Sequence, residues 1–216
     1  MNQDRTAATA AFLGPAILLA GLLWHPFIAK LTDNDAVVHA LAQDATRWFL
    51  SHFVVAIGAA VLLLAFLGVR AHIRATVGHE PWTSRAIVPL VLGTVLFALL
   101  PGMEIGILAV HESGGDALAA QNQLDTWFVP VLLAGSLLFA AGSVLFAIGV
   151  RKAAILPSTT SWLVVSALMV SAASRFVPMT GSLLVGALAL VIAFWTLGVT
   201  MWQAGGASTA MKGSPA

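Results

Sequence analysis

Apolar residues run along this chain in long stretches, separated by short polar segments. Each stretch has about 20 residues or more, the length that an α-helix needs to cross the hydrocarbon core of a bilayer. Six stretches are recognised, at about 10–29, 47–69, 86–110, 125–150, 160–178 and 182–203. The pattern predicts an all-α, polytopic membrane protein with six transmembrane helices in a single domain, residues 1–204.

The two ends of the chain carry different signals. Residues 1–9 have only Asp4 and Arg5 as charged residues, and no small-residue cleavage site follows the first apolar stretch. We therefore expect a retained helix there and not a removed signal peptide. The tail 205–216 is rich in Gly, Ser, Ala and Pro, and we expect it to be disordered.

The composition excludes several classes of domain, site and partner. The chain is 59% apolar and 9% charged, so no stretch is left over for a soluble domain. It has no cysteine, which excludes disulfides, thiolate nucleophiles and Cys-ligated clusters. It has no tyrosine, so a phenolic acid or base is excluded too. The net charge of +1 offers no basic surface for a nucleic acid.

The basic residues predict an orientation. With six spans, one side of the membrane receives Arg5, Arg70, Arg74, Arg85, Arg151, Lys152 and Lys212. The other side receives only Lys30, Arg47 and Arg175. Lys and Arg are enriched in cytoplasmic loops, so both termini are expected in the cytoplasm.

An internal repeat is a further possibility. Residues 58–70 and 139–151 match at six of thirteen aligned positions, and both segments end in Gly-Val-Arg. The match suggests three helical hairpins of related design. Chance recurrence of Ala, Leu, Val and Gly in a membrane sequence is the alternative.

Ionisable residues inside the apolar stretches are the main lead to function. They are costly in hydrocarbon and usually face a bundle interior or a cavity. With both termini cytoplasmic, His25 lies about 6 Å and Glu104 about 9 Å below the outer ends of their helices, at 1.5 Å per residue. His52 and Arg175 fall in the same outer-leaflet layer. The sequence therefore predicts one site built from His25, His52, Glu104 and Arg175.

Each of these residues has two interpretations. Glu104 suits a general acid or base, with His52 as its partner or relay and His25 tuning the pair. A structural ion pair, with Arg175 as one candidate partner, is the alternative. The wall of the pocket is assigned to Trp24, Trp48, Phe53 and Arg175. An aromatic belt for the rings and snorkelling of Arg175 to the headgroups are the alternatives.

A metal or haem site is weighed on the same residues. His25 and His52 are candidates for bis-His haem ligation, and His25, His52, Glu104 and His111 for zinc. No HExxH-type spacing occurs. We expect no metal and no cofactor, and haem is kept as an alternative.

Short motifs carry a resemblance. The chain has His25-Pro26 near the end of the first stretch, Trp48-x-x-x-His52 early in the second, and Glu104 in the third. In these it resembles a group of small bacterial six-helix integral membrane proteins of largely unknown function. The resemblance implies the fold and a place in the bacterial inner membrane, and it implies no activity.

A second similarity concerns the plan of the molecule. The small integral-membrane terpene cyclases are also compact helical bundles, and they protonate an isoprenoid olefin or epoxide with an intramembrane carboxylic acid. Glu104 among aromatic side chains is similar in kind. No Asp-rich motif for a diphosphate is present.

The expected partners are the lipid bilayer and a hydrophobic small molecule, and the expected function is lipid or isoprenoid chemistry. A non-enzymatic membrane subunit and a small transporter are the alternatives.

Overall fold

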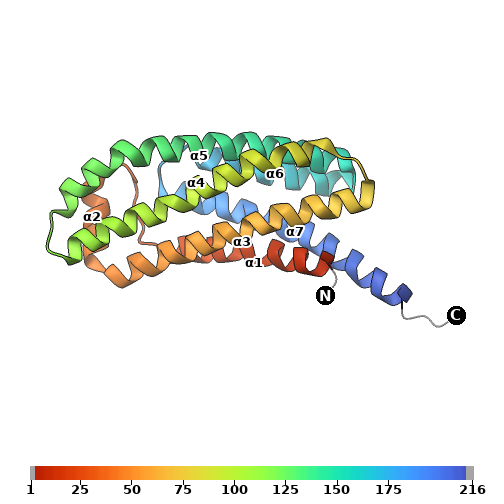
Figure 1. The fold of residues 1–216 in the computed structure, drawn as a ribbon, viewed down its shortest axis with the longest axis horizontal. Coiled ribbons are helices and arrows are strands. Elements are labelled where there is room, and N and C mark those ends of the chain that lie inside the picture. The colour runs from red at the N-terminus through yellow and green to blue at the C-terminus, as the bar shows by residue number, and fades with distance from the viewer. Residues whose placement is uncertain (1–2, 213–216) are drawn as a thin grey trace.

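The computed structural model describes residues 3–212 of the chain. Over this range the chain folds into seven α-helices joined by short connections (Figure 1). The helices are α1 (Gln3–Trp24), α2 (Asn34–Gln43), α3 (Ala45–Val77), α4 (Pro81–Glu112), α5 (Ala117–Ala153), α6 (Ser158–Ser174) and α7 (Thr180–Lys212). The all-helical prediction is confirmed.

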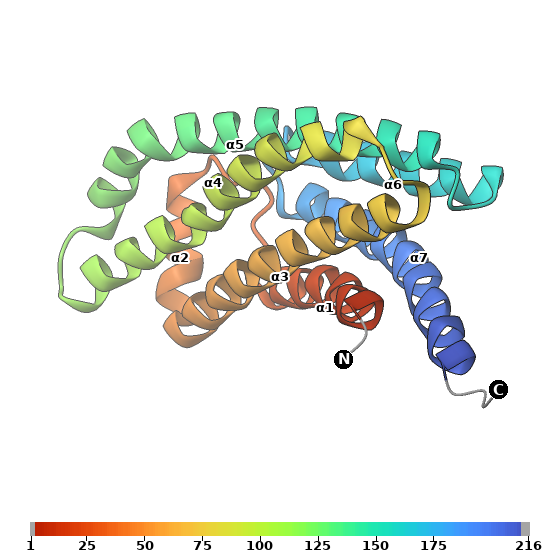
Figure 2. The same ribbon diagram turned by 45° about the vertical axis from the view of Figure 1, so that its right-hand side comes forward.

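The six longer helices form a closed ring. Neighbours in the chain pack side by side from α3 through α7, and α1 closes the ring by packing on both α3 and α7. Figure 2 shows the resulting elongated bundle from a second direction. The short helix α2 lies at one end, against α5 and α3, and the start of α1 and the end of α7 lie toward the other end (Figure 1).

Four phenylalanines fill the centre of the ring. The Phe66 ring meets those of Phe139, Phe146 and Phe194 edge to face, at centroid distances of 6.1, 5.0 and 4.7 Å. Each of these side chains is fully buried. Edge-to-face contacts set the positive ring edge against the negative face of its neighbour. They join α3, α5 and α7 across the bundle.

Close backbone contacts draw the helices together in pairs. A Cβ atom at Gly58 of α3 would lie 2.4 Å from the Leu18 nitrogen of α1. A Cβ atom at Gly93 of α4 would lie 2.5 Å from the Phe139 nitrogen of α5. Glycine is needed at both places, because these backbones touch where any side chain would stand. Small residues at helix crossings are typical of membrane bundles.

Five of the helices are long and apolar enough to cross a membrane: α1, α3, α4, α5 and α7. The chain is therefore a multi-pass membrane protein. The fifth predicted span, at 160–178, corresponds to α6, whose 17 residues end at Ser174.

Helix α2 was not predicted from the sequence. Asp33 caps it by accepting a hydrogen bond from the Ala36 N–H. Val37 and Leu41, one turn apart, are buried together with Trp48 of α3. In the sequence, Asp33, Asp35 and His39 give this segment the character of a polar connection.

The helix ends differ from the predicted bounds. Helix α1 begins at Gln3 and ends at Trp24, so His25 lies just beyond it. Helix α7 continues to Lys212. The structure thus places residues 205–212 of the expected disordered tail in a helix, and residues 213–216 lie outside the described range.

Candidate functional site

A cavity of about 120 Å³ lies inside the bundle, toward the end that carries α2. This space is large enough for several water molecules or part of a small ligand. Helices α3, α4 and α5 each line it with one stripe of residues three or four apart, as expected for one helical face. The stripes are Trp48, His52 and Val55; Phe97, Leu100, Pro101 and Glu104; and Asp125, Phe128, Val129 and Leu132.

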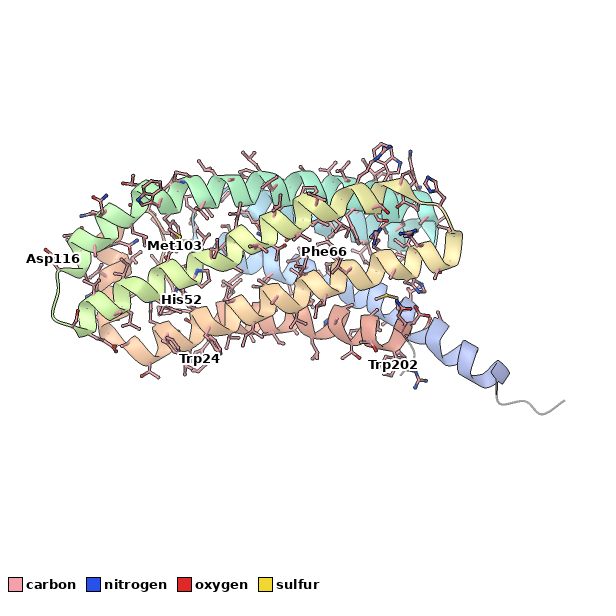
Figure 3. The ribbon with its side chains drawn as sticks, viewed as in Figure 1. Trp24, His52, Phe66, Met103, Asp116 and Trp202 are labelled. Atoms are coloured by element: carbon pink, nitrogen blue, oxygen red, sulfur yellow. The ribbon has the colours of Figure 1, made fainter. Side chains whose placement is uncertain are left out.

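A buried His–Glu pair forms the centre of the site. His52 Nε2 lies 2.6 Å from Glu104 Oε2, and the two side chains are 3% and 17% exposed. Figure 3 shows His52 between α3 and α4, on the side of the molecule that also carries Asp116. The pair links the second and third predicted spans.

The backbone fixes which nitrogen of His52 carries hydrogen. His52 Nδ1 lies 2.7 Å from the carbonyl oxygen of Trp48, one turn earlier in α3. A carbonyl oxygen can only accept, so Nδ1 must be the donor. Nε2 therefore faces Glu104 either as an acceptor from the carboxylic acid or as a donor to the carboxylate. One proton is shared across this contact.

His25 completes a cluster of three rings. Its centroid lies 4.8 Å from that of His52 and 5.2 Å from that of Trp48, and the Trp48 and His52 rings are 4.5 Å apart. His25 Nδ1 donates to the carbonyl oxygen of Pro26, 2.6 Å away. The three rings form one aromatic wall beside Glu104.

The loop after α1 is held against the loop before α7. The Thr180 hydroxyl donates to the Ile28 carbonyl oxygen at 2.8 Å and accepts from the Ile28 N–H at 3.1 Å. The Leu31 N–H donates to the Pro178 carbonyl oxygen at 3.0 Å. All four residues line the cavity. These bonds close the side of the cavity where α6 ends.

Arg175 lies inside the protein. It is 7% exposed, and its guanidinium carbon lies 3.5 Å from the Phe139 ring centroid and 4.2 Å from that of Phe97. It lines the cavity, and its Nη1 finds no hydrogen-bond acceptor among the described residues. The snorkelling interpretation is therefore wrong, because the guanidinium is buried against the rings of Phe97 and Phe139. The suggested ion pair with Glu104 is not formed, since Glu104 pairs with His52.

Two aromatic residues assigned to the pocket wall lie elsewhere. Trp24 and Phe53 are 48% and 51% exposed, and neither lines the cavity. Phe53 follows His52 in α3, so it points about 100° away around the helix. Figure 3 shows Trp24 at the outer edge of the bundle. Both rings face the surroundings of the bundle, as an aromatic belt does.

Sequence reasoning missed Asp125 and Thr180. Asp125 Oδ2 accepts a hydrogen bond from Asn34 Nδ2 of α2 at 2.8 Å, which ties α2 to α5 beside the cavity. The stripe at 125, 128, 129 and 132 was a usable signal, because it continues a single helical face. Thr180 had no such signal, since its partner is 152 residues away.

The arrangement does not fit bis-His haem. Both ring nitrogens of His52 are already engaged, with Trp48 and with Glu104. The His25 and His52 rings also touch one another, which leaves no space for a porphyrin plane between them. Among residues 3–212, no group of three or more His, Asp or Glu side chains is arranged to hold a metal ion.

Comparisons of the chain with protein-family models, with curated proteins and with solved structures give no match.

Proposed function

We propose that this protein is a membrane-embedded enzyme that carries out acid–base chemistry on a lipid-like or isoprenoid substrate. The observation that carries the proposal is the largely buried His52–Glu104 pair, with a 2.6 Å contact at the wall of a mostly apolar cavity. Ionisable groups in such surroundings are costly and usually functional.

The proposed setting is the bacterial inner membrane, with six spans and both termini in the cytoplasm. Helix α6, at 17 residues, measures about 25 Å, close to the hydrocarbon thickness of about 30 Å. Cations also lie over tryptophan rings at the end of the bundle away from α2. Arg85 and Lys152 lie over Trp82, and Arg151 lies over Trp162. A belt of Trp with Lys and Arg is typical of the cytoplasmic interface.

The wall of the cavity indicates the class of substrate. Most of its lining is aliphatic or aromatic, so an apolar chain is the favoured occupant. Trp48 and Phe128 also line the cavity, and aromatic ring faces stabilise a developing positive charge. These features support a polyprenyl substrate whose reaction passes through a carbocation.

The proposed reaction begins with Glu104 as a carboxylic acid. Its proton is transferred to a carbon of an olefin or to the oxygen of an epoxide, which leaves Glu104 as a carboxylate beside the neutral imidazole of His52. The cation closes a ring and then loses a proton from a neighbouring carbon to form a new double bond. That proton returns to the Glu104–His52 pair, so the product is an isomer of the substrate.

His52 and His25 have supporting roles in this scheme. The Trp48 carbonyl holds Nδ1–H of His52, so Nε2 is the nitrogen that exchanges the proton with Glu104. His25 packs against His52 and restrains its ring. Both act through Glu104 and are positioning residues.

The test is a matched pair of variants on α4. Glu104→Gln removes the acid, whereas Glu112→Gln changes an exposed carboxylate at the end of the same helix. Purified protein is incubated with linear polyprenyl olefins, alcohols, acids and epoxides, and the products are separated by gas chromatography with mass detection. We expect the wild type and Glu112→Gln to yield a product of unchanged mass and altered retention. Glu104→Gln should be slower by about 100-fold or more.

Two results contradict the proposal. One is a wild type that converts no member of the panel. The other is a Glu104→Gln variant that converts substrate at the rate of the wild type. In either case the His52–Glu104 pair is a structural link between α3 and α4.

A further inference from the structure

Arg175 is an ionisable residue of the cavity wall that the proposed chemistry does not use. Helix α6 ends one residue before it, and the guanidinium sits over the rings of Phe97 and Phe139 at the cavity wall. We propose that Arg175 binds the anionic head group, a carboxylate or a phosphate, of an amphipathic ligand in this cavity. The inference deepens the proposed function and rests on it for the identity of the cavity as the substrate site.

The lack of an acceptor carries the inference. Arg175 is 7% exposed and its Nη1 has no hydrogen-bond acceptor within the described part of the chain. A buried charge without a partner is strongly unfavourable, and the ring faces of Phe97 and Phe139 stabilise the cation without accepting its N–H groups. A planar guanidinium held in this way presents its edge to a group with two oxygens, such as a carboxylate or a phosphate.

The other ionisable residues of the wall already have polar partners. Glu104 is paired with His52, Asp125 accepts from Asn34, and His25 donates to Pro26. Arg175 is thus the wall residue left to recognise a charge from outside the protein. Its sign selects an anion.

The position of Arg175 also indicates where on the ligand the reaction occurs. Phe97, which the guanidinium contacts, and Glu104 are seven residues apart on one face of α4, about 10 Å along the helix axis. A ligand that reaches both places its head group at Arg175 and its reacting carbons in the tail. The substrate class is therefore a hydrophobic acid or monophosphate that reacts away from its head group.

The test compares three amphiphiles that differ only in the head group. Wild-type protein in a neutral maltoside detergent is titrated at pH 8 with dodecanoate, dodecyl phosphate or dodecanol, and binding is measured by the shift in melting temperature. We expect at least one anion to bind about tenfold or more tightly than the alcohol. The preferred anion identifies the head group as a carboxylate or a phosphate.

Variants locate the site. We expect Arg175→Gln to bind the anion and the alcohol equally, and Arg175→Lys to retain part of the preference. Arg151→Gln removes the same charge at the far end of the bundle and should keep the full preference. Equal binding of all three amphiphiles by the wild type overturns the proposal, and means that water satisfies the guanidinium. So does a folded Arg175→Gln variant that keeps the preference. If that variant does not fold, the titration of the wild type with the three amphiphiles still shows whether the protein prefers an anionic head group.

The two proposals fail separately. Glu104→Gln should keep the anion preference, because it leaves Arg175 in place. A wild type that prefers anions but converts no polyprenyl substrate overturns the enzyme and leaves the anion site. A wild type that converts neutral olefins but shows no anion preference overturns the anion site alone.

Discussion

One backbone carbonyl oxygen decides what His52 can do. The Trp48 carbonyl lies one turn before His52 in α3, and it accepts the hydrogen of Nδ1 at 2.7 Å. This contact follows from helix geometry and is predictable from the Trp-x-x-x-His spacing. The contact of Nε2 with Glu104 is not predictable in this way, because it depends on how α3 and α4 are rotated against each other. Local spacing sets the tautomer, and tertiary packing supplies the partner.

The ionisable residues of the apolar stretches were a good guide to the cavity, and the aromatic residues were not. His25, His52, Glu104 and Arg175 all line one cavity. They stand out in the sequence because an ionisable side chain in an apolar stretch is costly to place in hydrocarbon and usually faces the bundle interior or a cavity. Tryptophan and phenylalanine give no such signal, because their side chains are stable both inside the bundle and facing lipid. The sequence pattern alone could not separate the buried Trp48 from the exposed Trp24.

Glu80 provides a pH-dependent contribution to stability at the other end of the bundle. It is 6% exposed, and its carboxylate accepts hydrogen bonds from the Trp82 and Thr83 N–H groups and from the Thr83 hydroxyl, at 2.6–2.8 Å. Burial alone would raise the pKa of this carboxyl, but the hydrogen bonds outweigh it and hold the pKa below the ordinary 4.5. A lowered pKa in the folded state stabilises the protein above pH 4.5, and that stabilisation is lost as the pH falls through the folded-state pKa.

We expect Glu80→Gln to lower the free energy of unfolding by about 1 kcal/mol at pH 7, because it weakens the cap of α4. The difference from the wild type should shrink as the pH falls below 4.5. Melting in detergent across this pH range measures it. A difference that stays constant with pH would show that the charge of the carboxylate is not what stabilises the cap.

At the scale of the elements, glycine positions decide where two helices can pack with their backbones in contact. Two glycines of α4 differ in this respect. Gly93 touches the backbone of α5, whereas a Cβ atom at Gly106 would meet nothing within 4 Å. The sequence analysis gave no means of telling such glycines apart, because apolar spacing alone does not say which face of α4 meets α5.

Alanine substitutions at these two glycines should have opposite effects. Gly93→Ala forces α4 and α5 apart, and we expect it to cost about 1–3 kcal/mol of stability. Gly106→Ala gains helix propensity without a clash, and we expect a gain of up to about 1 kcal/mol. Chemical or thermal unfolding of the two variants in one detergent gives the comparison. Equal losses at both positions would mean that Gly93 does not mark the α4–α5 contact.

Long elements were predictable and short ones were not. Runs of about 20 apolar residues are unambiguous, because few structures other than a membrane span produce them. Helix α2 has ten residues and carries Asp35 and His39 among its apolar positions. Its helical form depends on docking over Trp48, which is a tertiary contact. The sequence therefore predicted the framework of the bundle and missed the helix that covers the end with the cavity.

At the scale of the whole molecule, the six longer helices close a ring whose two ends differ. The end near α2 holds the cavity and the ionisable cluster. The other end holds the basic helix ends and the tryptophans under their cations. Because Lys and Arg are enriched on the cytoplasmic side of membranes, we expect the basic end of this bundle to face the cytoplasm. The proposed orientation puts the cavity toward the outer leaflet.

The absence of cysteine makes that orientation directly testable. Two exposed positions mark the two ends: Ser113, after α4, and His79, before it. We expect Ser113→Cys to react with a membrane-impermeant maleimide added to intact spheroplasts. His79→Cys should react only after the membrane is opened, and the wild type, which has no cysteine, should not react at all. The reverse pattern would place the basic end outside and move the cavity to the inner leaflet, so a substrate would have to be supplied from the cytoplasmic side. Labelling of both positions in intact spheroplasts would show that the segment between them does not cross the membrane as a single fixed span, and would contradict the six-span arrangement.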